Sequence, residues 1–452
     1  MGRLAIDCLL VFGFFLGTSC GDFSLPKPER SSGKIWVFLA AGSKGWTEYR
    51  HQADIYHAYH IVRRNRIPNE NIVVMVNDDI AHHDSNPTPG VVINYPGGPN
   101  VYEGLLKDYT GLDVTPINFL NILTGNKTAM EGIGSGKVIE SGPDDVIFLN
   151  FVGHGTHGVL MFPNNQLFAD DFINAIKNMK NENRFSKMVI YIEACFAGSL
   201  FDNMLPDDIN VFVVTAADSR EPSSGCFRDD EQKTWLSNVF STLWMSFAEH
   251  ESFSEESLHH LYEKVRSYTN TSHPQEYGDL DLGEMKLKYI LGQRKKKSRR
   301  RMPPYTPLPT DVVNSMDIPL QIIIDQIRAA TDPVKKKQLK WDHKRLIERR
   351  ESVDKLFNDI MEKVVDNDKK KLEELRTLKL GLNEAIFKCY KTLYTTFSEY
   401  CMNPSQNPYS SLHFQKLVNM CTVDWLPEEK AKRDIMTMCT VSYGAMKPKD
   451  IV

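Results

Sequence analysis

A cysteine and a histidine each follow a strongly apolar run in this 452-residue sequence. Cys195 comes directly after residues 188–194, and His154 follows residues 146–152 with a glycine on each side. Such runs are typical of strands buried on both faces of a parallel sheet, where active sites gather at the carboxyl ends. A thiol and an imidazole placed there can act as nucleophile and base, and glycine N–H groups can stabilise an oxyanion. The sequence therefore predicts covalent catalysis by Cys195 with His154 as its base.

Each of these signals also has a simpler interpretation. A buried cysteine is more often a packing residue, and a Gly-His-Gly segment is often only a turn. Their occurrence at matching strand ends favours catalysis. We expect the other body cysteine, Cys226, to be a packed thiol, and His157 to be a solvated loop residue.

The elements that must position this pair can be traced along the chain. Apolar runs over residues 35–41, 72–76, 146–152, 188–194 and 211–216 alternate with helical patterns such as 49–66 and 170–180. Strands that alternate with helices predict a mostly parallel sheet covered on both faces. The predicted fold is an α/β/α sandwich.

The texture changes at Arg294, where seven basic residues lie within 294–301 and several prolines follow. Charge repulsion and proline together predict an exposed linker over residues 294–332. A nuclear-localisation or nucleic-acid patch is the alternative, but no aromatic residues interleave the basic run. Residues 1–293 hold 23 Lys and Arg against 37 Asp and Glu, whereas residues 294–452 hold 31 against 21. An acidic body is thus joined to a basic tail.

The tail, residues 333–452, shows apolar residues at helical spacing and predicts an all-α domain. Its four cysteines predict two disulfides, for which three connectivities are possible. They are Cys389, Cys401, Cys421 and Cys439.

The N-terminal 20 residues have a basic residue, a short apolar run and small residues, which is the layout of a signal peptide. A buried N-terminal helix is the other interpretation. No later run reaches the length of a membrane span. Glycosylation sequons at Asn126 and Asn270 agree with entry into the secretory pathway. We expect the destination to be a lysosome or other acidic vesicle, or secretion.

Several motifs carry a resemblance to a known family. They are Tyr49-Arg50-His51-Gln52-Ala53-Asp54, Gly153-His154-Gly155, Glu193-Ala194-Cys195 with Gly198-Ser199, Thr215-Ala216-Ala217, and the four tail cysteines. In this order, from about residue 34 to residue 439, they resemble the legumain family of caspase-like cysteine proteases.

The resemblance implies a six-stranded caspase-like sheet over residues 21–293 and a helical prodomain that caps the active site. It implies Cys195 and His154 as the catalytic pair and Gly155 as part of the oxyanion hole. It also implies a pocket that reads asparagine, bridges Cys389–Cys421 and Cys401–Cys439, and no metal or organic cofactor. We assign to the pocket Arg50, His51, Glu193, Ser223 and Asn238. The partners expected are protein and peptide substrates, the chain's own prodomain and cystatin-type inhibitors, with no nucleic acid.

Four positions depart from the family pattern. Glu48 replaces the asparagine that usually orients the histidine, and Gly153 replaces an aspartate. A pocket aspartate falls on Asn238, and a pocket serine falls on Pro222. We expect Glu48 to stabilise the protonated imidazole. The Asn238 amide could turn either its oxygen or its NH₂ toward a substrate and so accommodate aspartate, unless one of residues 229–231 supplies the missing carboxylate.

These departures leave two other functions open. A pseudoprotease that only binds partners would tolerate them, and the catalytic subunit of the GPI transamidase shares the Gly-His-Gly element but should end in a membrane span. For a peptidase, the opposite charges of body and tail predict acid-triggered activation, with Asn314 and Asp332 as candidate cleavage points.

Overall fold

A computed structural model describes residues 33–250, 253, 255–293 and 306–442. Its centre is a six-stranded sheet of order β11-β8-β7-β3-β1-β2, in which β11 alone runs antiparallel to its neighbour. The strands are β1 (Ile35–Ala41), β2 (Ile72–Met75), β3 (Val146–Val152), β7 (Lys187–Glu193), β8 (Val211–Thr215) and β11 (Gln275–Gly278). The sheet confirms the predicted fold class.

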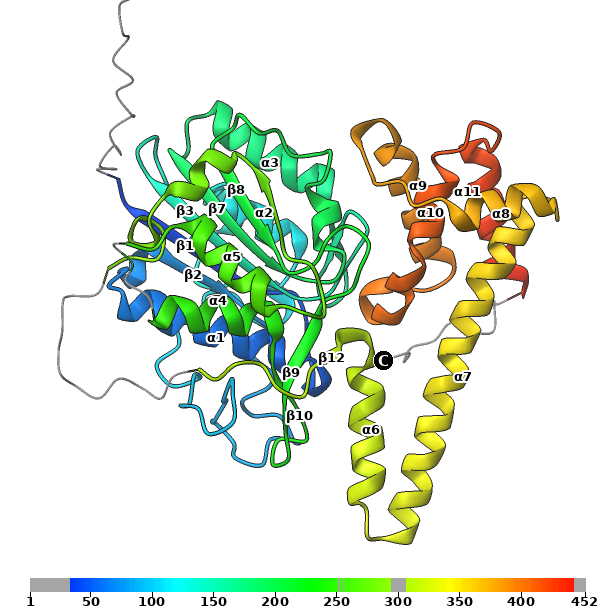
Figure 1. The fold of residues 1–452 in the computed structure, drawn as a ribbon, viewed down its shortest axis with the longest axis horizontal. Helices are drawn as coiled ribbons and strands as arrows, with labels where there is room; N and C mark the ends of the chain where they lie inside the picture. Colours follow the sequence, from blue (N-terminus) through cyan, green and yellow to red (C-terminus); the bar gives the residue numbers. More distant parts are fainter. Residues whose placement is uncertain (1–32, 251–252, 254, 294–305, 443–452) are drawn as a thin grey trace, which may run out of the picture.

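Helices cover both faces of this sheet (Figure 1). Alternate residues of β1 enter opposite cores: Phe38 packs in one and Leu39 in the other, which is why the strands are apolar throughout. The core around Leu39 includes α1 (Tyr49–Arg64), α4 (Val239–His250) and α5 (Leu258–Tyr268). The core around Phe38 includes α2 (Pro116–Leu123) and α3 (Ala169–Asn181).

Two small sheets lie beside the main one. One is formed by β4 (Gly155–Thr156), β5 (Val159–Met161) and β6 (Gln166–Phe168). The other has the order β10-β9-β12, with β9 (Ser224–Asp229), β10 (Thr234–Asn238) and β12 (Val313–Asn314).

The segment expected to be an irregular linker up to residue 332 contains regular structure. Beyond β12 it forms helix α6 (Ile318–Ala329), because β12 pairs with β9 and Ile318 and Ile322 pack on Trp235 of the body. The basic run at 294–301 and the predicted signal peptide at 1–20 lie outside the described residues.

The tail is helical, as the sequence predicts. It consists of α7 (Pro333–Val364), α8 (Lys369–Thr377), α9 (Glu384–Tyr400), α10 (Gln415–Met420) and α11 (Glu428–Thr437). Disulfides join Cys389 to Cys421 and Cys401 to Cys439, the pairing that the resemblance implies. Among the described residues, no helix combines the length and the apolar character needed to cross a bilayer.

Candidate active site

The ends of β3 and β7 bring Cys195 and His154 to one edge of the sheet. The two strands pair up to Val152 and Glu193, and the N–H of Gly153 donates to the Glu193 carbonyl at 2.9 Å. His154 and Cys195 follow within two residues. A Cβ at Gly155 would lie 2.7 Å from the Cys195 carbonyl oxygen, so the close approach of these chains requires glycine.

Cys195 is enclosed. Its sulfur accepts a hydrogen bond from the N–H of Ser223 at 3.3 Å and lies 3.9 Å from the Ser223 hydroxyl oxygen. Phe196 and Met316 pack with it, and 1% of its surface is exposed. Burial raises the pKa of the Cys195 thiol to about 11, with the Ser223 hydrogen bonds opposing the shift. In this closed form the sulfur is therefore a protonated, weakly nucleophilic thiol.

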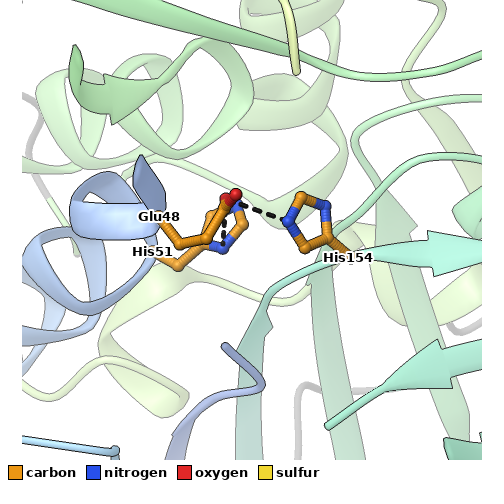
Figure 2. A group of neighbouring side chains, drawn as sticks. All are labelled: Glu48, His51 and His154. Carbon is orange, nitrogen blue, oxygen red and sulfur yellow. Dashed lines mark ion pairs between the residues drawn. The ribbon is translucent and has the colours of Figure 1, made fainter. Parts of the chain in front are cut away.

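Glu48 lies beside His154 and forms an ion pair with it (Figure 2). One of its oxygens, Oε2, lies 2.9 Å from Nε2 of His154 and 2.9 Å from an Nη atom of Arg50. Burial alone would raise the pKa of the Glu48 carboxyl, but His154 and Arg50 hold it well below its usual range. Glu48 is thus a carboxylate, and the expected contact with His154 is present.

His51 completes this group. Its Nδ1 is 3.7 Å from the same Glu48 oxygen and 2.6 Å from the Ser43 hydroxyl oxygen, and its ring meets the His154 ring edge-on. Burial, then Arg50, hold the pKa of His51 well below its usual range, which makes it a neutral imidazole. Glu48, His51 and His154 lie close enough together to hold a metal ion. However, the Glu48 oxygen that faces both histidines is already paired with the Arg50 guanidinium, which is a cation.

Asn238 is fixed at both ends of its amide. Its oxygen accepts a hydrogen bond from Nε of Arg50 at 3.0 Å, and its NH₂ donates to Asp54 at 2.7 Å. In the closed form these two bonds fix the amide, because turning it would break both, and its turning toward a substrate stays a prediction. The carboxylate that contacts Asn238 belongs to Asp54. Burial raises the pKa of Asp54 to about 6. Asp54 stands in the α1 motif, but nothing local to the sequence marks its contact with Asn238.

Glu193 and Arg50 present unused polar atoms. Oε2 of Glu193 accepts hydrogen bonds from the N–H and hydroxyl of Ser241, while Oε1 is buried and has no hydrogen-bond partner among the described residues. The same holds for one Nη of Arg50. Burial, reinforced by Asp54, raises the pKa of Glu193 to about 8, so Glu193 is mainly protonated below that pH.

The acids considered as substitutes for a pocket aspartate lie elsewhere. Asp229 caps the turn after β9 by accepting hydrogen bonds from the N–H groups of Glu231 and Gln232. Asp230 is exposed and paired with Arg228. None of the three takes part in the contacts of Arg50 or Asn238.

The chain between the domains crosses the site. β12 pairs antiparallel with β9, and the N–H of Ser315 donates to the Ser223 carbonyl at 3.1 Å. Arg350 of α7 holds this crossing by donating to the Met316 carbonyl and by pairing with Asp317 at 2.8 Å.

Both candidate cleavage residues use their side chains as caps. Asn314 accepts a hydrogen bond from the N–H of Met316, and Asp332 accepts hydrogen bonds from the first turn of α7.

The helical tail covers the rest of the site. The hydroxyl of Thr156 donates to the Ser411 carbonyl at 3.1 Å, and Lys391 pairs with Asp170 and Asp171 of α3 at 2.9 Å each. His157, expected to be a solvated loop residue, is buried instead. The sequence could not show this, because the covering residues come from the distant tail. Cys226 is a packed thiol that lies 3.3 Å from the Thr242 hydroxyl oxygen, as expected.

Comparison with known proteins supplies the family. Residues 35–293 match the peptidase C13 family, and residues 342–439 match the legumain prodomain. The chain is 40% identical to legumain of Bos taurus over 438 residues, covering 96% of this chain and 99% of that protein. It is 40% identical to legumain of Homo sapiens, covering 95% and 98%, and 34% identical to a vacuolar-processing enzyme of Citrus sinensis, covering 93% and 88%.

Among solved structures, caspase-1 of Spodoptera frugiperda aligns with a TM-score of 0.34 and 9% identity, covering 59% of this chain and 92% of that one. The sequence matches extend through the site and the helical tail together, and the chain belongs to the peptidase C13, or legumain, family of cysteine endopeptidases.

Proposed function

We propose that this endopeptidase cleaves peptide bonds after asparagine, and after aspartate to a lesser extent, and that acid releases its tail. The unused atoms of Arg50 and Glu193 carry the proposal for asparagine. A carboxamide needs a donor for its oxygen and an acceptor for its NH₂. The free Nη of Arg50 is a donor, and Oε1 of Glu193 keeps acceptor lone pairs even when the carboxyl is protonated. Both atoms are buried without partners among the described residues. A buried polar atom that gains a hydrogen bond only with the right substrate discriminates strongly.

The catalytic steps follow from the Cys195 and His154 positions. The Cys195 thiolate attacks the main-chain carbonyl carbon of the substrate asparagine, and the Gly155 region receives the oxyanion. The carbon–nitrogen bond breaks as protonated His154 gives its proton to the leaving amine. His154 then removes a proton from water, which attacks the thioester, and the product leaves as a carboxylic acid while Cys195 regains its proton.

The closed form accounts for latency. Met316 packs against Cys195, and burial keeps the thiol protonated. Between body and tail, Lys391 pairs with Asp170 and Asp171, and Lys177 pairs with Glu384. An ion pair of this kind requires an ionised carboxylate, and acid neutralises carboxylates. Acid therefore removes the negative partners and weakens the docking of the tail.

The secretory route stays part of this proposal. The sequon residues Asn126 and Asn270 are both exposed, which an attached glycan requires. Cystatin-type inhibitors would bind in the same cleft after the tail leaves. An acidic vesicle supplies the pH at which the tail is expected to detach.

Acid-treated protein assayed with three peptides that differ only in asparagine, aspartate or glutamine tests the proposal. We expect wild type to cleave the asparagine peptide fastest and the glutamine peptide slowest. Cys195→Ala should abolish turnover of all three, and His154→Ala should cause a loss of comparable size, because the two residues act as one unit. Equal rates for asparagine and glutamine would refute the pocket, and turnover by Cys195→Ala would refute the nucleophile.

A further inference from the structure

Arg50 has one ion-pair partner among the described residues. The guanidinium is fully buried and makes three contacts: its Nε donates to Asn238, an Nη donates to the Thr47 carbonyl at 2.9 Å, and the same Nη pairs with Glu48. The Asn238 amide and the Thr47 carbonyl are neutral. A buried cation needs a countercharge, and here Glu48 provides it.

The same Glu48 oxygen is also the partner of His154 (Figure 2). It lies 2.9 Å from Nε2 of the histidine and 2.9 Å from the Arg50 nitrogen. With the carboxylate next to Nε2, the other ring nitrogen, Nδ1, is the one that remains for proton exchange during catalysis. One atom therefore links the cation of the substrate pocket to the catalytic base.

We infer that Glu48 is a positioning residue that couples recognition of the substrate side chain at Arg50 to the orientation and charge of His154. The inference rests on the proposed function. It explains how the pocket tolerates the neutral Asn238 next to Arg50. The negative charge that balances Arg50 belongs to Glu48, which also contacts His154. A substrate oxygen bound to Arg50 then shares that cation with Glu48, and Glu48 in turn balances the imidazolium.

Charge on the histidine should depend on the groups that face this carboxylate. They are His154 at the end of β3, and Arg50 and His51 in the first turn of α1. His51 is neutral, so Arg50 and protonated His154 compete for one negative charge. With a neutral residue at position 48, Arg50 and protonated His154 would face each other across a buried site with no countercharge between them.

The test compares activated wild type with Glu48→Gln, which keeps the size of the side chain and removes its charge. Each protein is activated with a trace of wild-type enzyme, and kcat and KM are measured for asparagine and aspartate peptides from pH 4 to 8. We expect Glu48→Gln to lower kcat about tenfold or more and to move the alkaline limb of the kcat profile to lower pH. Glu140→Gln, which removes an exposed carboxylate paired with Lys127, is the matched control and should match wild type.

A second measurement on the same proteins, the rate of Cys195 alkylation, does not depend on turnover. The rate at which iodoacetamide alkylates Cys195 reports the thiolate that protonated His154 stabilises. In wild type this rate should stay measurable at acid pH, and in Glu48→Gln it should fall about tenfold there. The double variant Glu48→Asn/Asn238→Asp gives Arg50 a carboxylate at position 238 and none beside His154, and it should show the same shift of the alkaline limb as Glu48→Gln.

The outcomes separate two failures. If wild type does not cleave the asparagine peptide, the proposed function is wrong. If wild type cleaves it while Glu48→Gln keeps kcat within twofold and shows an unshifted profile and alkylation rate, the coupling through Glu48 is wrong. A variant that lost kcat equally at every pH, with unchanged alkylation, would also overturn the inference, because it would show only a structural role.

Discussion

The protonation states of individual residues in the site depend on burial. Glu193 has a pKa of about 8 because burial and then Asp54 disfavour its ionised form. A protonated Glu193 can donate a hydrogen bond to a substrate carboxylate, whereas the ionised form would repel it. We expect a substrate side chain that fills the pocket to maintain this burial.

We therefore predict that aspartate is a better substrate, relative to asparagine, below pH 8 than above it. Burial in the folded protein raises the pKa of Glu193, so the carboxyl stays neutral below about pH 8 and becomes charged as the pH rises through that value. The kcat/KM of the aspartate peptide divided by that of the asparagine peptide should fall about tenfold in wild type as the pH rises from 6 to 9. In Glu193→Gln the ratio should stay flat over this range. A fall of equal size in both proteins would mean that another group titrates.

Gly155 allows a second prediction at this scale. A methyl group at this position would lie 2.7 Å from the Cys195 carbonyl oxygen and 3.1 Å from the Ala194 Cβ, so the backbone of the nucleophile would have to move. We expect Gly155→Ala to lower kcat about a hundredfold, since misplacement of about an ångström has that effect. Gly142→Ala meets nothing within 4 Å and is the control, expected to keep wild-type kcat. Normal kcat in Gly155→Ala would separate this glycine from the catalytic geometry.

At the scale of elements, β12 behaves as an added strand that imitates a substrate. The N–H of Ser315 donates to the Ser223 carbonyl beside Cys195, and the Ser315 hydroxyl is buried with no hydrogen-bond partner among the described residues. The Ser315 hydroxyl makes no hydrogen bond with the unpaired atoms of Arg50 and Glu193. The segment therefore occupies the cleft without supplying the side chain that the pocket reads.

Ser315→Asn should convert this inhibitory segment into a substrate. After acid treatment, intact-mass analysis should find a fragment that ends at residue 315, formed at least tenfold faster than any cleavage there in wild type. Ser315→Gln has a similar polarity and an extra methylene, and should give much less of this fragment. Unchanged fragments in Ser315→Asn would mean that residue 315 does not face the pocket.

Local sequence patterns account for some elements and not for others. The run at 188–194 predicts β7 within one residue at each end, because a strand buried on both faces is apolar throughout. β12 and α6 were not predicted, because Val313 and Ile318 are ordered by contacts with Gly225 and Trp235 far away in the sequence. The contact of Asp54 with Asn238 joins α1 to β10 and is equally invisible locally.

For the whole molecule, His157 connects the pH to the docking of the tail. It lies on Phe196, next to the nucleophile, and lines a cavity with Leu412 and Gln415 of the tail and with the cations Arg220 and Lys379. Burial lowers the pKa of His157 to about 4. The closed form thus keeps this histidine neutral, and an open form would let it titrate near its ordinary value of about 6.5.

We predict that His157 helps to open the molecule in acid. Because its pKa is depressed in the closed form, the closed form loses stability as the pH falls below 6.5, and the effect is complete near pH 4. In a Cys195→Ala background, hydrogen exchange of β9, corrected for the intrinsic effect of pH, reports opening. Adding His157→Gln should move the opening midpoint down by about half a pH unit or more. His82→Gln, at an exposed position of the body, should leave it in place, and equal midpoints in all three proteins would exclude His157.

The pairing of β12 with β9 also determines which proteins this enzyme can attack. Once the tail leaves, β9 has a free edge that can be completed only by an extended chain, about 3.3 Å per residue. An asparagine held in a helix, or in the middle of another sheet, cannot offer its N–H and carbonyl groups to that edge. Cleavage of a folded protein should therefore follow the free energy of local unfolding around each asparagine, so that mobile loops and acid-unfolded regions are cut first. Stabilising a loop without changing its sequence should protect it.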